Sequence, residues 1–183
     1  MMSLLRRAWG AARLDVATYE EVEADRTANG QAFVVVLLSA VGAGLGSIEN
    51  GGVDGIVWSS LAALIGWWIW AWLTYWIGTR LLPGKDTEAD HGELLRTIGF
   101  SSAPGVLRIF AVLPMIGGLV YLIATLWMLV AMVIGVRQAL DYHSPESGAT
   151  SGTGRAIAVC AIGFPVYALF IAVSLLILGP WPV

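Results

Sequence analysis

Charged residues are scarce in this chain. Only 13% of its 183 residues are Asp, Glu, Lys or Arg, whereas soluble domains contain about 25%. The single cysteine, Cys160, lies in an apolar run and excludes an intramolecular disulfide. One cysteine and two scattered histidines are too few for a dedicated zinc site. The chain also lacks a basic block, which argues against nucleic acid as a partner.

Apolar residues dominate the sequence instead. They make up 57% of the chain, against about 45–50% in soluble domains. A chain with room for one domain cannot bury that much apolar surface in its own core. We therefore predict an all-α fold and a polytopic membrane protein. No cleavable signal peptide is expected, because the first 30 residues contain no apolar h-region.

The apolar segments predict five transmembrane helices. A helix needs about 20 residues to cross the hydrocarbon core. Spans three and four come from one long apolar stretch, which we divide within the sequence PMIGG at residues 114–118. Pro104 lies inside span three and predicts a kink or a break there. The transmembrane domain is placed at residues 31–183, with spans at about 31–48, 55–79, 94–115, 118–137 and 156–179.

Residues 1–30 are predicted to form a cytoplasmic segment outside these spans. Within residues 3–13, apolar side chains recur at helical spacing while the arginines fall largely on the other face. This pattern is typical of a short amphipathic helix in the membrane interface, although such a helix can also pack on the protein's own core. Thr18 with Glu21, and Asp90 with Glu93, have the spacing of capping boxes and predict two further helix starts.

The distribution of basic residues predicts the orientation. Of the ten Lys and Arg residues, nine lie in or at the edges of the N-terminal segment, loop 80–97 and loop 138–155. With five spans, all three regions share one side of the membrane. The positive-inside rule places that side in the cytoplasm. The N-terminus is thus expected inside and the C-terminus outside.

Arg108 is the one basic residue outside these three regions, and it is the main candidate for a functional group. An unbroken helix would place it about 18 Å beyond Arg96 along the axis, where a charge costs about 2.5–3.5 kcal/mol. It must either snorkel to the surface or lie buried in a pocket with Pro104 nearby. Three acids are possible partners, as are backbone carbonyls near Pro104 or a lipid phosphate. These acids are Asp141, Glu49 and Asp54. Asp141 also stands four residues after Arg137, so a local ion pair is an alternative for it.

Two further patterns are candidates for packing or binding. Span two carries several tryptophans in mid-span, Trp67 and Trp70 among them. They either fill gaps beside small residues or line an aromatic cleft for a lipid or apolar ligand. Gly42 and Gly46 form a GxxxG motif, which favours close helix packing.

Several segments, taken in order, are similar to those of a known family. They are YEEV at 19–22 with Asp25, Ala28, Gln31 and Ala32, LTYWIGTRLL at 73–82, ELLRTIGFSSAPGVLRIF at 93–110, LPMIGG at 113–118 and VRQALDY at 136–142. Together they resemble the Yip family. Its eukaryotic members are membrane proteins that interact with Rab GTPases. The resemblance implies a five-helix membrane domain with a cytoplasmic N-terminus, and no catalytic residue is carried over from it. The chain is lysine-poor and rich in Ala and Gly, which is typical of the prokaryotic branch and predicts the inner cell membrane.

No nucleophile–base pair, phosphate loop or metal cluster is visible, so we expect no enzyme, no cofactor, no catalytic residue and no metal site. The first hypothesis is a non-enzymatic scaffold that interacts with lipid or protein. The second is a small transporter, channel or lipid-moving protein that uses Arg108 and the tryptophan-rich span. The lipid bilayer is the expected partner, and bound lipids, protein partners or a second copy of the chain remain open.

Overall fold

The computed structural model describes residues 2–46, 48–85, 87–142 and 148–178. These residues form helices and loops without a strand, which confirms the all-α prediction. In chain order the elements are α1 (Met2–Ala12), α2 (Val16–Ala24), the 3-10 helix η1 (Arg26–Ala28), α3 (Asn29–Gly46), α4 (Ile48–Trp76), the π-helix η2 (Ile77–Leu81), α5 (His91–Ser101), the 3-10 helix η3 (Ala103–Val112), α6 (Gly117–Ala139) and α7 (Gly148–Leu178).

Several helices are long and apolar enough to cross a bilayer, which confirms a multi-pass membrane protein. Within the described residues there are four such segments, and they correspond to predicted spans one, two, four and five. Their bounds are Arg26–Gly46, Gly52–Leu81, Gly117–Ala139 and Gly152–Leu169. The predicted end of span five, at residue 179, lies outside the described residues.

Predicted span three is two helices instead of one. The α-helix α5 ends at Ser101, and the 3-10 helix η3 begins at Ala103 with Pro104 in its first turn. Proline has no N–H to donate and disfavours the helical conformation before it, which explains the break. Ten residues of 3-10 helix rise about 20 Å, less than the ~30 Å hydrocarbon core. The break expected at Pro104 is therefore present, and the count of five crossings stays a prediction.

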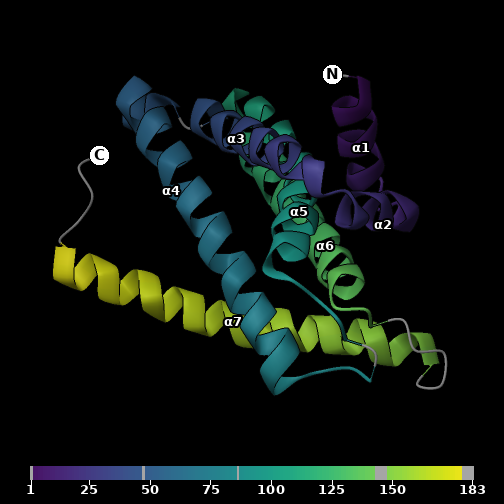
Figure 1. The fold of residues 1–183 in the computed structure, drawn as a ribbon. Coiled ribbons are helices and arrows are strands. Elements are labelled where there is room, and N and C mark those ends of the chain that lie inside the picture. Colours follow the sequence, from purple (N-terminus) through teal and green to yellow (C-terminus); the bar gives the residue numbers. More distant parts are fainter. Residues whose placement is uncertain (1, 47, 86, 143–147, 179–183) are drawn as a thin grey trace.

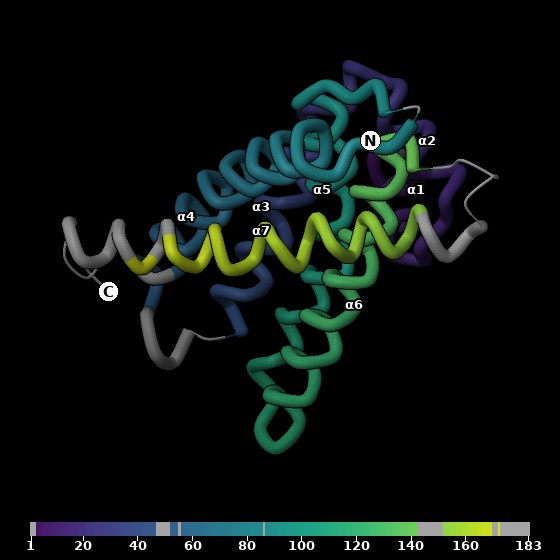
Figure 2. Tube along the Cα trace, turned by 90° about the horizontal axis from the view of Figure 1, so that it is seen from below, coloured from purple at the N-terminus to yellow at the C-terminus, as the bar shows by residue number. Residues whose placement is uncertain are grey.

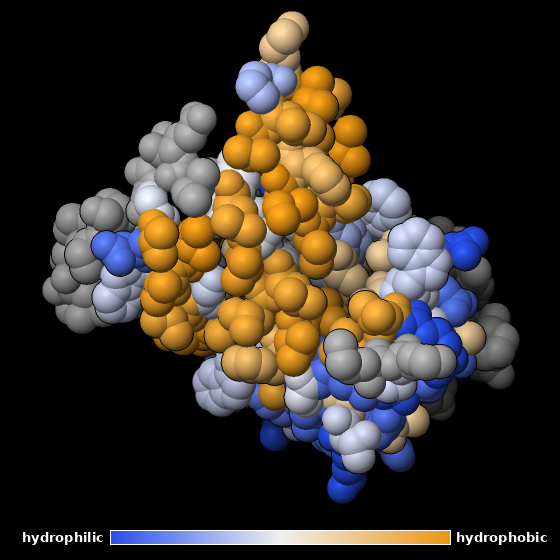
Figure 3. All heavy atoms as spheres, turned by 90° about the horizontal axis from the view of Figure 1, so that it is seen from above, coloured by the Kyte–Doolittle hydropathy of each residue, from blue (hydrophilic) through white to orange (hydrophobic). Residues whose placement is uncertain are grey.

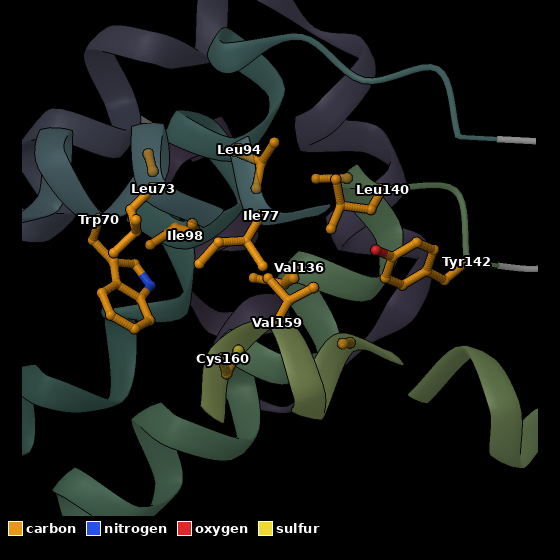
Figure 4. Close-up of a cluster of buried hydrophobic side chains, with 13 residues drawn as sticks. Trp70, Leu73, Ile77, Leu94, Ile98, Val136, Leu140, Tyr142, Val159 and Cys160 are labelled. Carbon is orange, nitrogen blue, oxygen red and sulfur yellow. The ribbon is translucent and has the colours of Figure 1, made fainter. Parts of the chain in front are cut away.

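The helices do not form a parallel bundle. The helices η3 and α6 make a hairpin that projects from the body, and α7 lies crosswise to α6 (Figure 2). In Figure 1 the helices α1 and α2 lie together at one end of the molecule, beside the start of α3. One core cluster forms where α4, η2, α5, α6 and α7 meet (Figure 4). It includes Trp70, Leu73, Ile77, Leu94, Ile98, Val136, Leu140, Tyr142, Val159 and Cys160.

The two predicted helix starts have different outcomes. The capping box of α5 is confirmed, since Asp90 Oδ1 accepts from the Glu93 backbone N–H at 2.8 Å and Glu93 Oε2 accepts from the Asp90 N–H at 2.7 Å. The box at Thr18 and Glu21 is wrong. The N-cap residue of α2 is Asp15, and the Thr18 hydroxyl donates to its Oδ2 at 2.6 Å. Glu21 is instead drawn towards the arginines of α1.

The surface divides into a polar and an apolar part. In the view of Figure 3, hydrophilic atoms gather at one corner and apolar atoms cover most of the remaining face. The long helices expose large apolar side chains, which suits contact with lipid. Those of α4 include Leu61, Ile65, Trp68, Trp72 and Trp76.

Candidate functional site

Arg108 lies on η3 and reaches the facing side of α6. Its Nη2 donates a hydrogen bond to Thr125 Oγ1 at 2.9 Å. Its Cζ lies 4.7 Å from the centroid of the Tyr121 ring, a cation–π distance. The Nε group is buried and has no hydrogen-bond partner among the described residues. The guanidinium is thus held in place by neutral groups and keeps one donor unused.

No acid neutralises Arg108 within the described part of the chain. Asp54 is exposed on α4, and the side chain of Glu49 lies outside the described residues. Asp141 does not pair with Arg108, contrary to the expectation. It follows the other end of α6, where its Oδ2 accepts from the Glu88 backbone N–H at 3.3 Å. The tight turn at residues 113–116 brings Arg108 beside the beginning of α6, whereas Asp141 follows its end.

The predicted local pair between Arg137 and Asp141 is also wrong. Arg137 Nε donates to Gln138 Oε1 at 3.1 Å, and its Nη1 donates to Thr153 Oγ1 at 3.2 Å. The backbone of Asp141 adopts φ 51°, so the helix has ended before the carboxylate can lie one turn above Arg137. The i, i+4 spacing pairs side chains only on a continuous helix.

Arg108 lines a cavity of about 350 Å³ between α3, α4, α6 and α7. The aromatic side chains of Trp67, Trp70, Phe164 and Tyr167 line the same cavity. The structure therefore brings together Arg108 and the tryptophans, which the sequence analysis considered as two separate candidate sites. Small and hydroxylated residues complete much of the lining, namely Ser39, Ala40, Ala43, Ser59, Ala63, Gly66, Ser101, Ser102 and Thr125.

The two tryptophans differ in how their indole N–H groups are used. Trp67 Nε1 donates to the Leu95 backbone oxygen at 3.0 Å. Trp70 Nε1 is buried and has no partner among the described residues. The Trp70 ring contacts Phe164 at 5.0 Å and Tyr167 at 5.6 Å between centroids. Trp70 therefore belongs to the core cluster and also borders the cavity.

Gly42 and Gly46 lie against η3, the element that carries Arg108. A Cβ added at Gly42 would lie 3.1 Å from the Val106 backbone oxygen. A Cβ added at Gly46 would overlap the backbone oxygen of Arg108 itself. The two glycines thus allow α3 to approach η3 backbone to backbone. Pro104 is buried and does not line the Arg108 cavity, so the trio of Arg108, Pro104 and Asp141 is not one site.

The polar end of the molecule, which we call the cap, consists of α1, α2 and the start of α5. Arg7 is buried and pairs with Glu21 at 2.9 Å and Asp25 at 2.7 Å. Arg96 is 2% exposed and donates to the backbone oxygens of Val22, at 3.1 Å, and Glu23. Every arginine buried in the cap therefore has strong acceptors within the described residues.

The surroundings of the acidic residues in the cap shift their pKa values. Hydrogen bonds from Thr27 and Arg7 lower the pKa of Asp25 to about 2. Burial raises the pKa of Glu23 to about 7, and the nearby carboxylates of Asp141 and Glu93 add to the effect. We therefore expect the cap to respond to pH near neutrality through Glu23.

The chain matches the model of the Yip1 domain over residues 15–175. It belongs to the Yip1 family. Comparisons with curated proteins and with solved structures gave no match. The Yip1 match begins just before α2 and ends within α7, so it covers the Arg108 cavity completely.

Sequence reasoning missed the residues of the Yip1 domain that hold Arg108 in place. Tyr121 and Thr125 are one turn apart on α6 and contact the guanidinium together. The sequence did contain a signal for these two residues, because a tight antiparallel turn near residue 114 places Arg108 opposite residues 121–125. The described residues contain no group of three or more His, Cys, Asp or Glu side chains placed to hold a metal ion.

Proposed function

We propose that this Yip1-domain protein is a non-enzymatic membrane scaffold that binds lipid in the Arg108 cavity. One observation carries the proposal. The guanidinium of Arg108, on the apolar helix η3, has an unused donor and no acid partner among the described residues. Such a charge is costly in a membrane unless an anion compensates it.

The chemistry of the cavity favours an amphiphile with an anionic group. A phosphate or carboxylate would accept charge-assisted hydrogen bonds from Arg108. Trp70 also lines the cavity, and its Nε1 is buried without a hydrogen-bond partner among the described residues. The rings of Trp67, Phe164 and Tyr167 provide an apolar wall for an acyl chain. The proposed site residues are therefore Arg108, Trp67 and Trp70.

Native mass spectrometry of the detergent-purified protein tests this proposal. We expect co-purified or added phosphatidylglycerol to bind more tightly than phosphatidylcholine. The variant Arg108→Gln should lose most of this preference, and Arg26→Gln, at an exposed arginine of η1, should keep it. A competition experiment with inorganic phosphate tests whether the site prefers a free anion. Displacement of the lipid by millimolar phosphate would identify a site for a free anion. Equal lipid binding by wild type and Arg108→Gln would reject the site.

A second candidate function is lipid movement across the bilayer. The observation in its favour is the break between α5 and η3, because Ser101 and Ser102 at this break line the cavity. Polar groups along a membrane cavity can lower the barrier for a headgroup. Vesicles with fluorescent lipid and external dithionite measure this directly. Loss of inner-leaflet fluorescence, abolished by Arg108→Gln, would favour lipid movement, and protected fluorescence with bound lipid would favour the scaffold.

We further propose an inner-membrane protein with the N-terminus in the cytoplasm and the C-terminus outside. The ion-paired cap supports this orientation, since it gathers Arg6, Arg7 and Arg96 at one end. Reporter fusions at the two termini test the assignment. A cytoplasmic signal from both ends would indicate an even number of crossings and remove η3 from the count.

A further inference from the structure

A second cavity lies on the other side of η3, under the N-terminal helix. It has a volume of about 360 Å³ and separates the apolar side of α1 from α3, η3 and α6. Arg13 is the one charged side chain among the described residues that line it. We call it the α1 groove. Its lining is Leu4, Leu5, Ala8, Trp9, Ala12, Arg13, Val35, Leu38, Ala103, Pro104, Val106, Leu107 and Trp127.

Polar contacts hold α1 in place beside this groove. On one side, Arg6 and Arg7 pair with Glu21 at 2.6 and 2.9 Å. At the end of α1, Trp127 Nε1 donates to the Ala12 backbone oxygen at 2.7 Å. The helix is thus fixed along its polar side and at its C-terminal end, while its apolar residues overhang η3.

The apolar side of α1 is continuous with the surface that faces lipid. Leu5 and Trp9 are 63% and 67% exposed. Across the groove, Leu38, Val106 and Leu107 are also exposed, and they belong to α3 and η3. The groove therefore opens between an amphipathic helix and membrane-embedded elements, where acyl chains are the abundant apolar molecules.

The charge at the rim decides which lipid fits. Arg6 and Arg7 are neutralised within the cap, whereas Arg13 is exposed and has no ion-pair partner among the described residues. An exposed arginine at the end of an apolar groove complements a lipid phosphate. Trp9 and Trp127 flank the groove, and tryptophan prefers the headgroup level of a bilayer.

We propose that the α1 groove binds one acyl chain of an anionic phospholipid from the leaflet on the side of α1, with its phosphate at Arg13. The site is separate from the Arg108 cavity, because none of its lining residues is shared. The lipid would fill the space between α1 and η3 and secure the cap to the membrane.

Photo-crosslinking tests the α1 groove. The full chain is reconstituted in phosphatidylcholine vesicles that contain phosphatidylglycerol with a diazirine in its acyl chain. We expect crosslinks within residues 4–13 and 103–107. The groove-filling variant Ala8→Phe should remove them, and Ala17→Phe, on the exposed part of α2, should keep them. Arg13→Gln should keep the crosslinks and lower the preference for phosphatidylglycerol over phosphatidylcholine about fivefold, the equivalent of ~1 kcal/mol per basic residue.

Other outcomes would overturn the proposal. Crosslinks confined to the exposed faces of α4 and α6, with residues 4–13 unlabelled, would show that lipid does not enter the groove. In a parallel experiment with a diazirine-bearing amino acid in place of Leu5, covalent dimers would identify a second copy of the chain as the occupant. The variant Arg108→Gln keeps the two lipid proposals apart, since it should leave the α1 groove crosslinks unchanged even where anionic lipid is lost from the Arg108 cavity.

Discussion

Arg96 and Arg108 stand in one stretch of chain and have opposite environments. Arg96 lies in the cap, and its guanidinium donates to the backbone oxygens of Val22 and Glu23 and, at 3.5 Å, to Asn29 Oδ1. Arg108 lies beyond the break at Ser102, where one hydroxyl and one aromatic ring hold it and Nε has no partner.

The difference separates a structural arginine from a candidate binding arginine. The guanidinium of Arg96 donates its hydrogen bonds to acceptors within the protein, so its contacts join α5 to α2. Arg108 lines a cavity and has no acid partner among the described residues, so an anionic ligand there can gain from its charge without breaking an ion pair of the fold. Buried polar groups that lack partners are unusual, and they are concentrated at functional sites.

The largest expected effect comes from removing Arg96. In Arg96→Met the carbonyls of Val22 and Glu23 lose their donor while remaining buried. We expect a loss of about 2–4 kcal/mol in the free energy of unfolding, because hydrogen bonds to a charged group are strong and the acceptors stay unsatisfied. Thermal unfolding in detergent measures the loss, with Arg26→Met at an exposed site as the control. Equal melting temperatures for the two variants would contradict the structural role.

The contact of α3 with η3 should be almost as sensitive. In Gly46→Ala the new methyl group overlaps the backbone oxygen of Arg108, and such overpacking costs about 1–3 kcal/mol. In Gly30→Ala nothing lies within 4 Å, and the higher helix propensity of alanine should stabilise by about 0.5–1 kcal/mol. Opposite shifts in melting temperature are therefore expected. A stabilised Gly46→Ala would mean that η3 does not lie against α3.

The cap should respond to pH through Glu23. Its folded pKa of about 7 is above the ordinary value of 4.5, so the folded state takes up a proton first as the pH falls. Stability is then lowest above pH 7 and increases as the pH falls towards 4.5. We expect a gain of ~1–2 kcal/mol, or about 3–6 °C in melting temperature. Glu23→Gln should flatten this dependence, and Glu88→Gln, on the exposed loop, should leave it intact. A melting temperature that falls with acidification in wild type alone would contradict this sign.

Arg108→Met should have the smallest effect on the fold. The variant loses one hydrogen bond to Thr125 and removes a charge that has no acid partner among the described residues. In lipid-depleted detergent we expect a change within about 1 kcal/mol in either direction. Added phosphatidylglycerol should raise the melting temperature of wild type and not of the variant. If Arg108→Met destabilises as much as Arg96→Met without lipid, the contrast between the two arginines fails.

Short-range sequence patterns predicted the membrane character and two helix boundaries. Composition and apolar run length predicted a multi-pass helical protein, because backbone groups in lipid must be satisfied within each segment. The capping box at Asp90 and the break at Pro104 followed from local backbone chemistry. The capping box predicted at Thr18 and Glu21 had the correct spacing but did not form, because the arginines of α1 pair with Glu21. No local sequence pattern contains that contact.

The candidate site required the tertiary structure. Arg108 and the two tryptophans were each visible in the sequence, yet their meeting in one cavity depends on how η3 and α6 fold back against α3 and α4. The sequence suggested Asp141 as a partner of Arg108 and did not suggest Thr125, because the spacing along the chain does not show which side chains face each other. The sequence by itself determined a membrane-embedded helical chain with one isolated charge, because hydrophobicity and helix length act locally. Only the folded arrangement decided that this charge lines a cavity beside aromatic rings, because side chains far apart in the chain meet through packing.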